Sequence, residues 1–186
     1  MPHITLESHL PGITGLLEYR KDTGESIREL TQLLLRGPST LTEAEREMLA
    51  TVVSHNNECK FCTSAHAAVV NMMLGENETM PKVQLNISTA PVSDKMKALL
   101  TIAAQTGQSG RLVSFDAIKS AKIAGATDKE IHDTVLIASL FSMYNRYVDG
   151  MATAMPENAE YFEMLAHRLV NHGYSRLPQG YDHLKK

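Results

Sequence analysis

The sequence predicts an all-α protein. Helical periodicity runs through nearly all of the 186 residues, and no stretch shows the period-two alternation between turn residues that is typical of a strand. Capping-box motifs at Thr42 and Thr127 mark helix starts. At this length, with 43% hydrophobic residues, we expect a single domain over residues 1–186 with a sizeable core. We predict a bundle of about six to eight helices without a sheet, with an N-terminal arm over 1–24 and a C-terminal tail over 173–186.

Three helices are expected in the N-terminal half. Residues 26–36 carry apolar side chains on one face and end at a Gly-Pro pair, which stops a helix. A capping box opens the next helix, over 42–56, and an Asn-Asn pair interrupts it. The apolar pattern resumes over 57–75. Residues 75–91 are rich in Asn, Thr, Ser and Pro and lack periodicity, so we expect a surface connection there.

Four more helices are expected in the C-terminal half. Those over 93–105 and 114–124 are each followed by a glycine, which favours a helix end. The helix over 127–151 begins with a capping box and is hydrophobic nearly all round, which predicts a central helix or one buried in a subunit interface. A proline in a first-turn position opens the last helix, over 156–171.

The charge balance excludes several classes of partner. The chain has 18 Lys+Arg and 21 Asp+Glu, a formal net charge of -3, so it lacks the basic surplus that binds a phosphate backbone or an anionic membrane. No apolar run approaches the roughly 20 residues that span a bilayer, and the N-terminus does not have the order of a signal peptide. We therefore expect a cytoplasmic protein with no nucleic-acid or membrane partner.

The two cysteines of the chain, Cys59 and Cys62, carry the clearest chemical signal. Two randomly placed cysteines would stand three residues apart only about once in a hundred chains of this length. A structural disulfide is not expected in the cytoplasm, which leaves redox chemistry, a metal site or chance. Near a helix start, free backbone N–H groups favour thiolates, so we expect both sulfurs to be acidified. His66 lies one turn after Cys62 on the same face and can take its proton, which makes Cys62 the expected nucleophile and places Cys59 to close a disulfide on the oxidised sulfur.

An acidic group behind the histidine would help it to cycle protons. The candidates are Glu43, Glu45, Glu47 and Glu58, and spacing alone does not choose among them. Glu58, beside the cysteines, most simply interacts with the dipole of the helix start. Glu47 lies on the preceding helix and can turn its carboxylate inward.

The segment from Glu47 to His66 resembles a known motif. A Glu followed twelve residues later by Cys-x-x-Cys-x-x-x-His is similar to the motif of the AhpD-like alkylhydroperoxidases of the carboxymuconolactone decarboxylase superfamily. The resemblance covers roughly residues 14–172 and is closest to the branch of peroxidase-related enzymes. It implies an AhpD-like helical bundle in which Glu47, Cys59, Cys62 and His66 form a proton relay and a redox pair.

The resemblance also implies a reaction and partners. Cys62 would reduce hydrogen peroxide or an organic hydroperoxide in antioxidant defence, and Cys59 would condense with the resulting sulfenic acid. A dithiol reductant protein, thioredoxin-like or lipoyl-bearing, would then reset the pair, with no cofactor or metal. The family assembles as a homotrimer or homohexamer. The chain departs from the best-studied branch at Phe61, where that branch has a histidine, and His55, one helical turn before Cys59, could stand in for it.

Three alternatives stay open. The two cysteines and His66, completed by Glu47 or His55, could bind zinc, although a third ligand on the same helix fits a tetrahedron poorly. The lactone decarboxylases of the superfamily lack the cysteine pair, which argues against that activity. A redox sensor or scaffold could use the same disulfide, and only turnover with a reductant separates it from a peroxidase.

Overall fold

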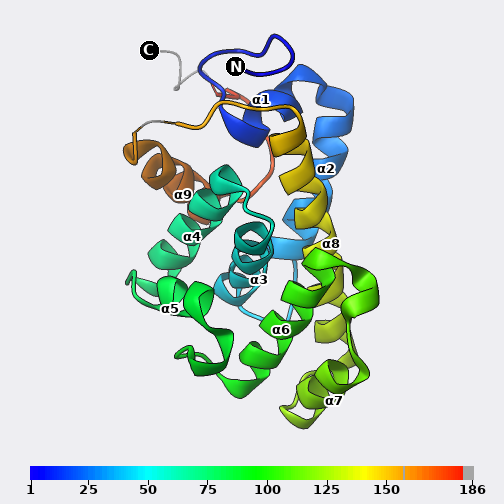
Figure 1. The fold of residues 1–186 in the computed structure, drawn as a ribbon. Helices are drawn as coiled ribbons and strands as arrows, with labels where there is room; N and C mark the ends of the chain where they lie inside the picture. The colour runs from blue at the N-terminus through cyan, green and yellow to red at the C-terminus, as the bar shows by residue number, and fades with distance from the viewer. Residues whose placement is uncertain (157, 182–186) are drawn as a thin grey trace.

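The computed structural model describes residues 1–156 and 158–181, and over these residues the protein is all-helical (Figure 1). The expected fold class is confirmed, but the described residues form nine α-helices, one more than the upper end of the predicted number, with two short 3₁₀ helices and no strand. The α-helices are α1 (Gly12–Tyr19), α2 (Lys21–Arg36), α3 (Glu43–Asn56), α4 (Lys60–Leu74), α5 (Thr79–Leu85), α6 (Asp94–Gln108), α7 (Phe115–Ile123), α8 (Asp128–Gly150) and α9 (Glu160–His172), and the 3₁₀ helices are η1 (Ile87–Thr89) and η2 (Gly110–Leu112).

Two of the helices, α1 and α5, have no counterpart among the expected elements. Helix α1 and the first turn of α2 lie within the segment 1–24 that was expected to be an arm. Helix α5 and η1 lie within the expected surface connection, so that prediction is wrong over residues 79–89. Both helices are too short to be stable alone, and burial of Leu16, Leu17, Met80 and Val83 stabilises them.

Helix α3 lies at the centre of the bundle (Figure 1). It packs against α4 on one side and against α6 and α8 on the other, and α9 covers the outer face of α4. Helix α8 also contacts α1, α2 and α6, but one of its faces, which includes Met143 at 41% exposure, is open to solvent. The helix is therefore not buried all round within the chain, and its burial in a subunit interface stays a prediction. Both predicted capping boxes are formed, at Thr42 with Glu45 and at Thr127 with Glu130, so the sequence signal correctly marks the starts of α3 and α8.

The turn between α3 and α4 positions the cysteines. The fourth helix begins at Lys60, three residues later than expected, because Glu58 adopts φ 60° and the backbone N–H of Cys59 bonds to the carbonyl of Ser54. A left-handed residue cannot continue a right-handed helix. Cys59 is consequently the N-cap of α4, and Cys62 lies within its first turn.

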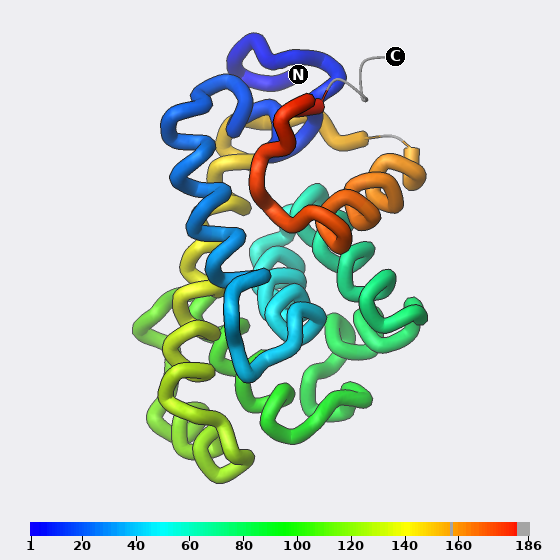
Figure 2. Tube along the Cα trace, turned by 180° about the vertical axis from the view of Figure 1, so that it is seen from behind, coloured from blue at the N-terminus to red at the C-terminus, as the bar shows by residue number. Residues whose placement is uncertain are grey.

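The C-terminal segment returns across the bundle (Figure 2). At Gly173 the chain leaves α9 with φ 64°, and a Cβ there would collide with the side chain of Gln32. The Gln32 side chain accepts a hydrogen bond from the N–H of Tyr174 (2.7 Å), which fixes the direction of the segment. Residues 173–181 then run back to the N-terminal segment, whereas the rest of the predicted tail, residues 182–186, lies outside the described residues.

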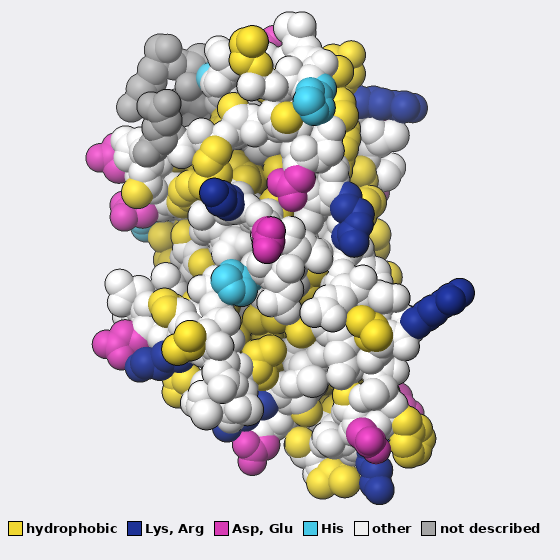
Figure 3. Space-filling model, in the orientation of Figure 1, with side chains coloured by type: hydrophobic (Ala, Val, Ile, Leu, Met, Phe, Trp, Pro, Cys, Tyr) yellow, Lys and Arg dark blue, Asp and Glu magenta, His cyan; other side chains and the backbone are white. Residues whose placement is uncertain are grey.

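The surface carries charges of both signs. Lysine, arginine and acidic side chains are interspersed on the face drawn in Figure 3, and no strongly basic patch appears there. None of the helices in the described ranges has the length and apolar character needed to cross a bilayer.

Candidate active site

The two cysteine sulfurs face one another at the start of α4. Their Sγ atoms are 3.0 Å apart, and both residues are free thiols with 0% exposure for Cys59 and 3% for Cys62. A disulfide needs a bond of about 2.05 Å, so the sulfurs would close by only about 1 Å to form one. The geometry therefore suits a dithiol that cycles with a disulfide.

The two thiols do not share the same acidity. The contact with Cys62 lowers the pKa of Cys59 against the opposing effect of burial. The same contact, together with burial, raises the pKa of Cys62. The prediction that both sulfurs are acidified is therefore wrong for Cys62, because two thiolates in contact would repel each other and one proton is retained between them. The pKa of Cys59, at the N-cap, is therefore the lower of the two thiol pKa values.

Glu47 is the acidic residue that the fold turns inward. Its carboxylate is completely buried, and Oε2 lies 2.7 Å from Nδ1 of His66. Its other oxygen, Oε1, is 2.6 Å from Nη2 of Arg36 and accepts a hydrogen bond from the hydroxyl of Tyr174 at 2.6 Å. The structure thus brings together Glu47 and His66 as expected, and adds Arg36 and Tyr174, which the sequence analysis missed.

The electrostatics of this cluster keep Glu47 ionised. Burial raises its pKa, but the charge and hydrogen bond of His66, the charge of Arg36 and the hydroxyl of Tyr174 outweigh burial, so that its net pKa is lowered. Burial and the negative charge of Glu47 hold the pKa of Tyr174 well above its ordinary value, so the phenol stays protonated. An ionised carboxylate only accepts hydrogen bonds, so Nδ1 of His66 must donate to it, and Nε2, on the opposite side of the ring, is the nitrogen left to exchange a proton.

The other acidic candidates and His55 lie elsewhere. Glu45 serves the capping box of α3, and Glu43 lies near the guanidinium of Arg36 at 3.4 Å. Glu58 is exposed in the turn before Cys59, and His55 is exposed in the last turn of α3, outside the cavity described below. Side-chain burial, rather than spacing, selects Glu47.

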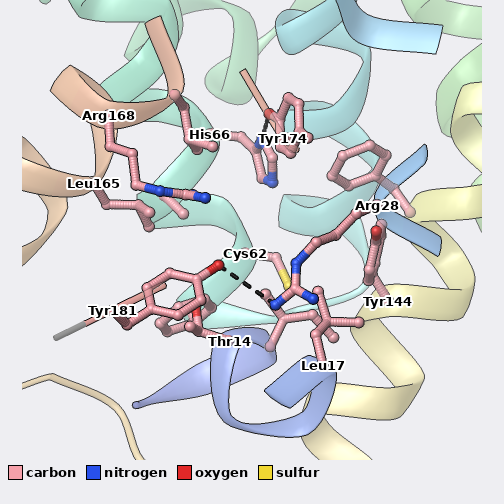
Figure 4. A pocket seen from close by; sticks show the side chains of 15 residues that line it. Thr14, Leu17, Arg28, Cys62, His66, Tyr144, Leu165, Arg168, Tyr174 and Tyr181 are labelled. Atoms are coloured by element: carbon pink, nitrogen blue, oxygen red, sulfur yellow. Dashed lines mark hydrogen bonds between the residues drawn. The ribbon is translucent and has the colours of Figure 1, made fainter. Parts of the chain in front are cut away.

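A cavity of about 60 Å³ lies between Cys62 and the C-terminal segment (Figure 4). Helices α1, α2, α4, α8 and α9 and the segment after α9 contribute to its wall, most of which is aliphatic or aromatic. Cys62 and His66 both line it, whereas Cys59 does not. Among the described residues no hydrogen bond joins His66 to Cys62, so the direct proton transfer expected between them has no contact to follow in this structure.

Phe61, which replaces the histidine of the best-studied branch, forms an apolar part of this wall. Its ring packs against the rings of Tyr161 and Phe162, with centroids 6.2 and 5.7 Å away. Gly12 lies against the other side of the ring, where a Cβ would overlap it. The position between the cysteines therefore contributes packing rather than a proton-transfer group.

Metal ligation finds no support in the arrangement of side chains. Within residues 1–156 and 158–181, no three His, Cys, Asp or Glu side chains are grouped so that they could hold an ion.

Comparison with known proteins agrees with this geometry. The family model of the carboxymuconolactone decarboxylase family matches residues 21–105, a range that includes Glu47, both cysteines and His66. A solved structure of a peroxidase-related protein from Silicibacter sp. TM1040, itself uncharacterized, is similar over 82% of this chain and 78% of its own, with 28% identity and a TM-score of 0.74. The chain is thus similar to the carboxymuconolactone decarboxylase family over residues 21–105 and to a peroxidase-related protein over most of its length.

Two other solved structures share the fold of this chain. An uncharacterized peroxidase-related protein with an alkylhydroperoxidase AhpD core, from Ralstonia eutropha JMP134, is 22% identical over 84% of this chain and 80% of its own, with a TM-score of 0.74. A protein of unknown function from Agrobacterium tumefaciens is 18% identical over 77% of this chain and 97% of its own, with a TM-score of 0.64. No curated protein matches the sequence.

Proposed function

We propose that this protein is a thiol-dependent peroxidase that reduces hydrogen peroxide or small organic hydroperoxides in antioxidant defence. The observation that carries the proposal is the position of Cys62, which lines a cavity together with His66 and has the sulfur of a second thiol 3.0 Å from its own. The match to the carboxymuconolactone decarboxylase family model and the likeness to a peroxidase-related protein support it.

In the first step, Cys62 becomes the nucleophile. Its proton passes to the thiolate of Cys59 across the 3.0 Å contact, which leaves a Cys62 thiolate facing the cavity. The thiolate attacks the terminal oxygen of the hydroperoxide and breaks the O–O bond. Nε2 of His66 takes the proton of the terminal oxygen and returns it to the leaving oxygen, so that an alcohol or water departs and a sulfenate remains on Cys62.

In the second step, Cys59 resolves the oxidised sulfur. Its thiol attacks Cys62, the S–S bond forms, and the sulfenate oxygen leaves as hydroxide with the proton of Cys59. The two thiols have then supplied the two electrons that reduce the peroxide. A dithiol protein, thioredoxin-like or lipoyl-bearing, restores both thiols by disulfide exchange.

The proposal extends to location and assembly. We place the reaction in the cytoplasm, where thiols are kept reduced. We also propose a homotrimer or homohexamer. Phe115 and Ile123 of α7 are 80% and 78% exposed, which supports association through this helix.

A stopped-flow titration of the reduced protein with hydrogen peroxide tests the chemistry. The wild type should lose two thiols per peroxide, Cys62→Ser should be inert, and Cys59→Ser should stop at a sulfenic acid. Thiols that stay intact, or that oxidise no faster than free cysteine, would exclude the peroxidase. Rapid oxidation without turnover in the presence of a dithiol protein would instead favour a redox sensor or scaffold.

A further inference from the structure

Two arginines reach the wall of the cavity that Cys62 lines. Arg28 extends from α2 and Arg168 from α9, and Figure 4 shows both guanidinium groups directed toward the space in front of Cys62. Arg28 is only 3% exposed, so its charge lies inside the protein. The peroxide chemistry described above uses neither residue.

Each guanidinium keeps a buried nitrogen that has no hydrogen-bond partner among residues 1–156 and 158–181. Nη2 of Arg28 donates to Oε1 of Glu18 (2.7 Å) and to the hydroxyl of Tyr181 (3.5 Å), but Nη1 is buried and bonds to none of the described residues. Nη2 of Arg168 donates to the carbonyl of Ser175 (3.2 Å), whereas its Nε is also buried and has no partner within the same ranges. An unsatisfied buried donor is costly, so both arginines are incomplete without an acceptor in the cavity.

The cavity also carries an excess of positive charge. Among the described residues, Glu18 is the one carboxylate that pairs with Arg28, and it also binds Arg176, with Nη2 3.0 Å from Oε2. One negative charge therefore faces two guanidinium groups. Arg168 has no carboxylate partner among the residues of the described structure, and it stacks on the ring of Tyr181, with its Cζ 4.9 Å from the centroid.

A carboxylate is the group that completes this arrangement. Guanidinium groups bind carboxylates through two parallel N–H donors, and such bonds are stronger than bonds between neutral groups. A cavity of about 60 Å³ with a mostly aliphatic and aromatic wall admits a small molecule rather than a long chain. We propose that Arg28 and Arg168 bind the carboxylate of a small hydroperoxide and direct its peroxide group to Cys62, so that the preferred substrates are carboxylated hydroperoxides. This inference rests on the proposed peroxidase function.

A matched pair of substrates tests the inference. 2-Hydroperoxy-2-methylpropanoate differs from tert-butyl hydroperoxide by a carboxylate in place of one methyl group. Because a hydrogen bond to a charged group contributes about 1.5 kcal/mol or more, the carboxylated substrate should oxidise the wild type at least about tenfold faster. Arg28→Gln should abolish this preference and leave the rate with tert-butyl hydroperoxide within about twofold of wild type.

Two further variants separate binding from folding. Arg168→Gln, on the less buried arginine, tests the site independently if Arg28→Gln does not fold, and it should reduce the preference in the same direction. Arg176→Gln is the matched control, because like Arg28→Gln it removes a guanidinium that pairs with Glu18. Arg176 does not line the cavity, so this variant should keep the full wild-type preference for the carboxylated hydroperoxide. Equal slowing with both hydroperoxides in Arg28→Gln would overturn the inference, because the arginine would then act on the thiols rather than on the substrate.

A binding measurement that needs no turnover distinguishes this inference from the peroxidase proposal. Isobutyrate should bind Cys62→Ser protein in calorimetry, and Arg28→Gln in that background should weaken its binding at least about tenfold. Binding without peroxide reduction would retain the carboxylate site and exclude the peroxidase. Reduction of both hydroperoxides without isobutyrate binding would retain the peroxidase and exclude the carboxylate site. Tighter binding of inorganic phosphate than of isobutyrate would exclude a site that is selective for carboxylates.

Discussion

Replacing Glu47 by glutamine removes the charge at the centre of the buried cluster. The carboxylate is completely buried and contacts Arg36, His66 and Tyr174 at 2.6, 2.7 and 2.6 Å. Without it, the guanidinium of Arg36, whose side chain is 5% exposed, still donates to the carbonyls of Leu35 and Leu169. Among the described residues, the more distant Glu43, at 3.4 Å, is then its one carboxylate partner. Removing one partner of a buried ion pair costs about 3 to 5 kcal/mol, and we expect about 3 kcal/mol because the amide oxygen can still accept hydrogen bonds. In a protein of this length that cost lowers the melting temperature by about 6 to 12 °C.

The same substitution changes the proton on His66. If the amide oxygen stays with Arg36 and Tyr174, the NH₂ group faces Nδ1 of His66. That nitrogen must then accept a hydrogen bond, so the proton moves to Nε2 and the nitrogen on the other side of the ring is no longer a base. A general base contributes about 10² to 10⁴ to a rate, so Glu47→Gln should oxidise Cys62 at least about a hundredfold more slowly than wild type.

Two measurements and one control check this reasoning. Urea denaturation gives the free energy of unfolding, and stopped-flow thiol titration gives the rate with hydrogen peroxide. Glu43→Gln removes a charge on the same helix and from the same arginine, but its side chain is 43% exposed and does not contact His66. We expect it to cost less than about 1 kcal/mol and to keep the wild-type rate. The reasoning is refuted if the free energy of unfolding of Glu47→Gln lies within about 1 kcal/mol of wild type and its rate with hydrogen peroxide equals the wild-type rate. The buried cluster would then neither stabilise the fold nor support His66 as a base.

Three further substitutions have expected outcomes. Glu130 is buried in the capping box of α8 and pairs with a lysine of α6 at 2.8 Å. Burial raises the pKa of Glu130, but hydrogen bonds from the lysine and from threonines outweigh burial and lower the pKa from its ordinary value of 4.5 to about 2. Because the pKa of Glu130 is lower in the folded than in the unfolded protein, Glu130→Gln should lower the free energy of unfolding, measured in urea, by about 3 kcal/mol at neutral pH. The difference in this free energy between wild type and variant should shrink as the pH falls from about 4.5 to 2. A difference that is constant over this range would contradict the ion pair. Gly12→Ala places a methyl group against the ring of Phe61, at a residue whose φ is 59°, so it should lower the free energy of unfolding by more than about 1 kcal/mol. The control Gly110→Ala places its methyl group in open space and should lower this free energy by less than that amount. Thr42→Ala removes the capping box of α3 and should cost about 1 kcal/mol without slowing peroxide oxidation, and a tenfold slower rate would show that this helix end is coupled to the site.

Local signals in the sequence predict most of the helices. The capping boxes at Thr42 and Thr127 and the left-handed glycine at Gly75 are each complete within a few residues, so they mark helix ends correctly. The missed helices, α1 and α5, are eight and seven residues long, and their stability depends on apolar side chains that the rest of the bundle buries. The later start of α4 was missed for a similar reason. Glu58 adopts a left-handed conformation, which the sequence does not predict because the residue is not a glycine.

By itself, the sequence determined the fold class, the cysteine pair, and the helix face that His66 shares with Cys62, because these depend on residues close together in the chain. Only the tertiary structure decided that Glu47 is the buried acid, that Tyr174 donates to it from 127 residues away, and that Cys62 rather than Cys59 faces the cavity. The same is true of Arg28, whose unpaired nitrogen is buried by helices from both ends of the chain. Periodicity records which residues share one helix face, whereas burial and contact depend on how separate helices pack, and so the chemistry of the cavity appears only after the chain is folded.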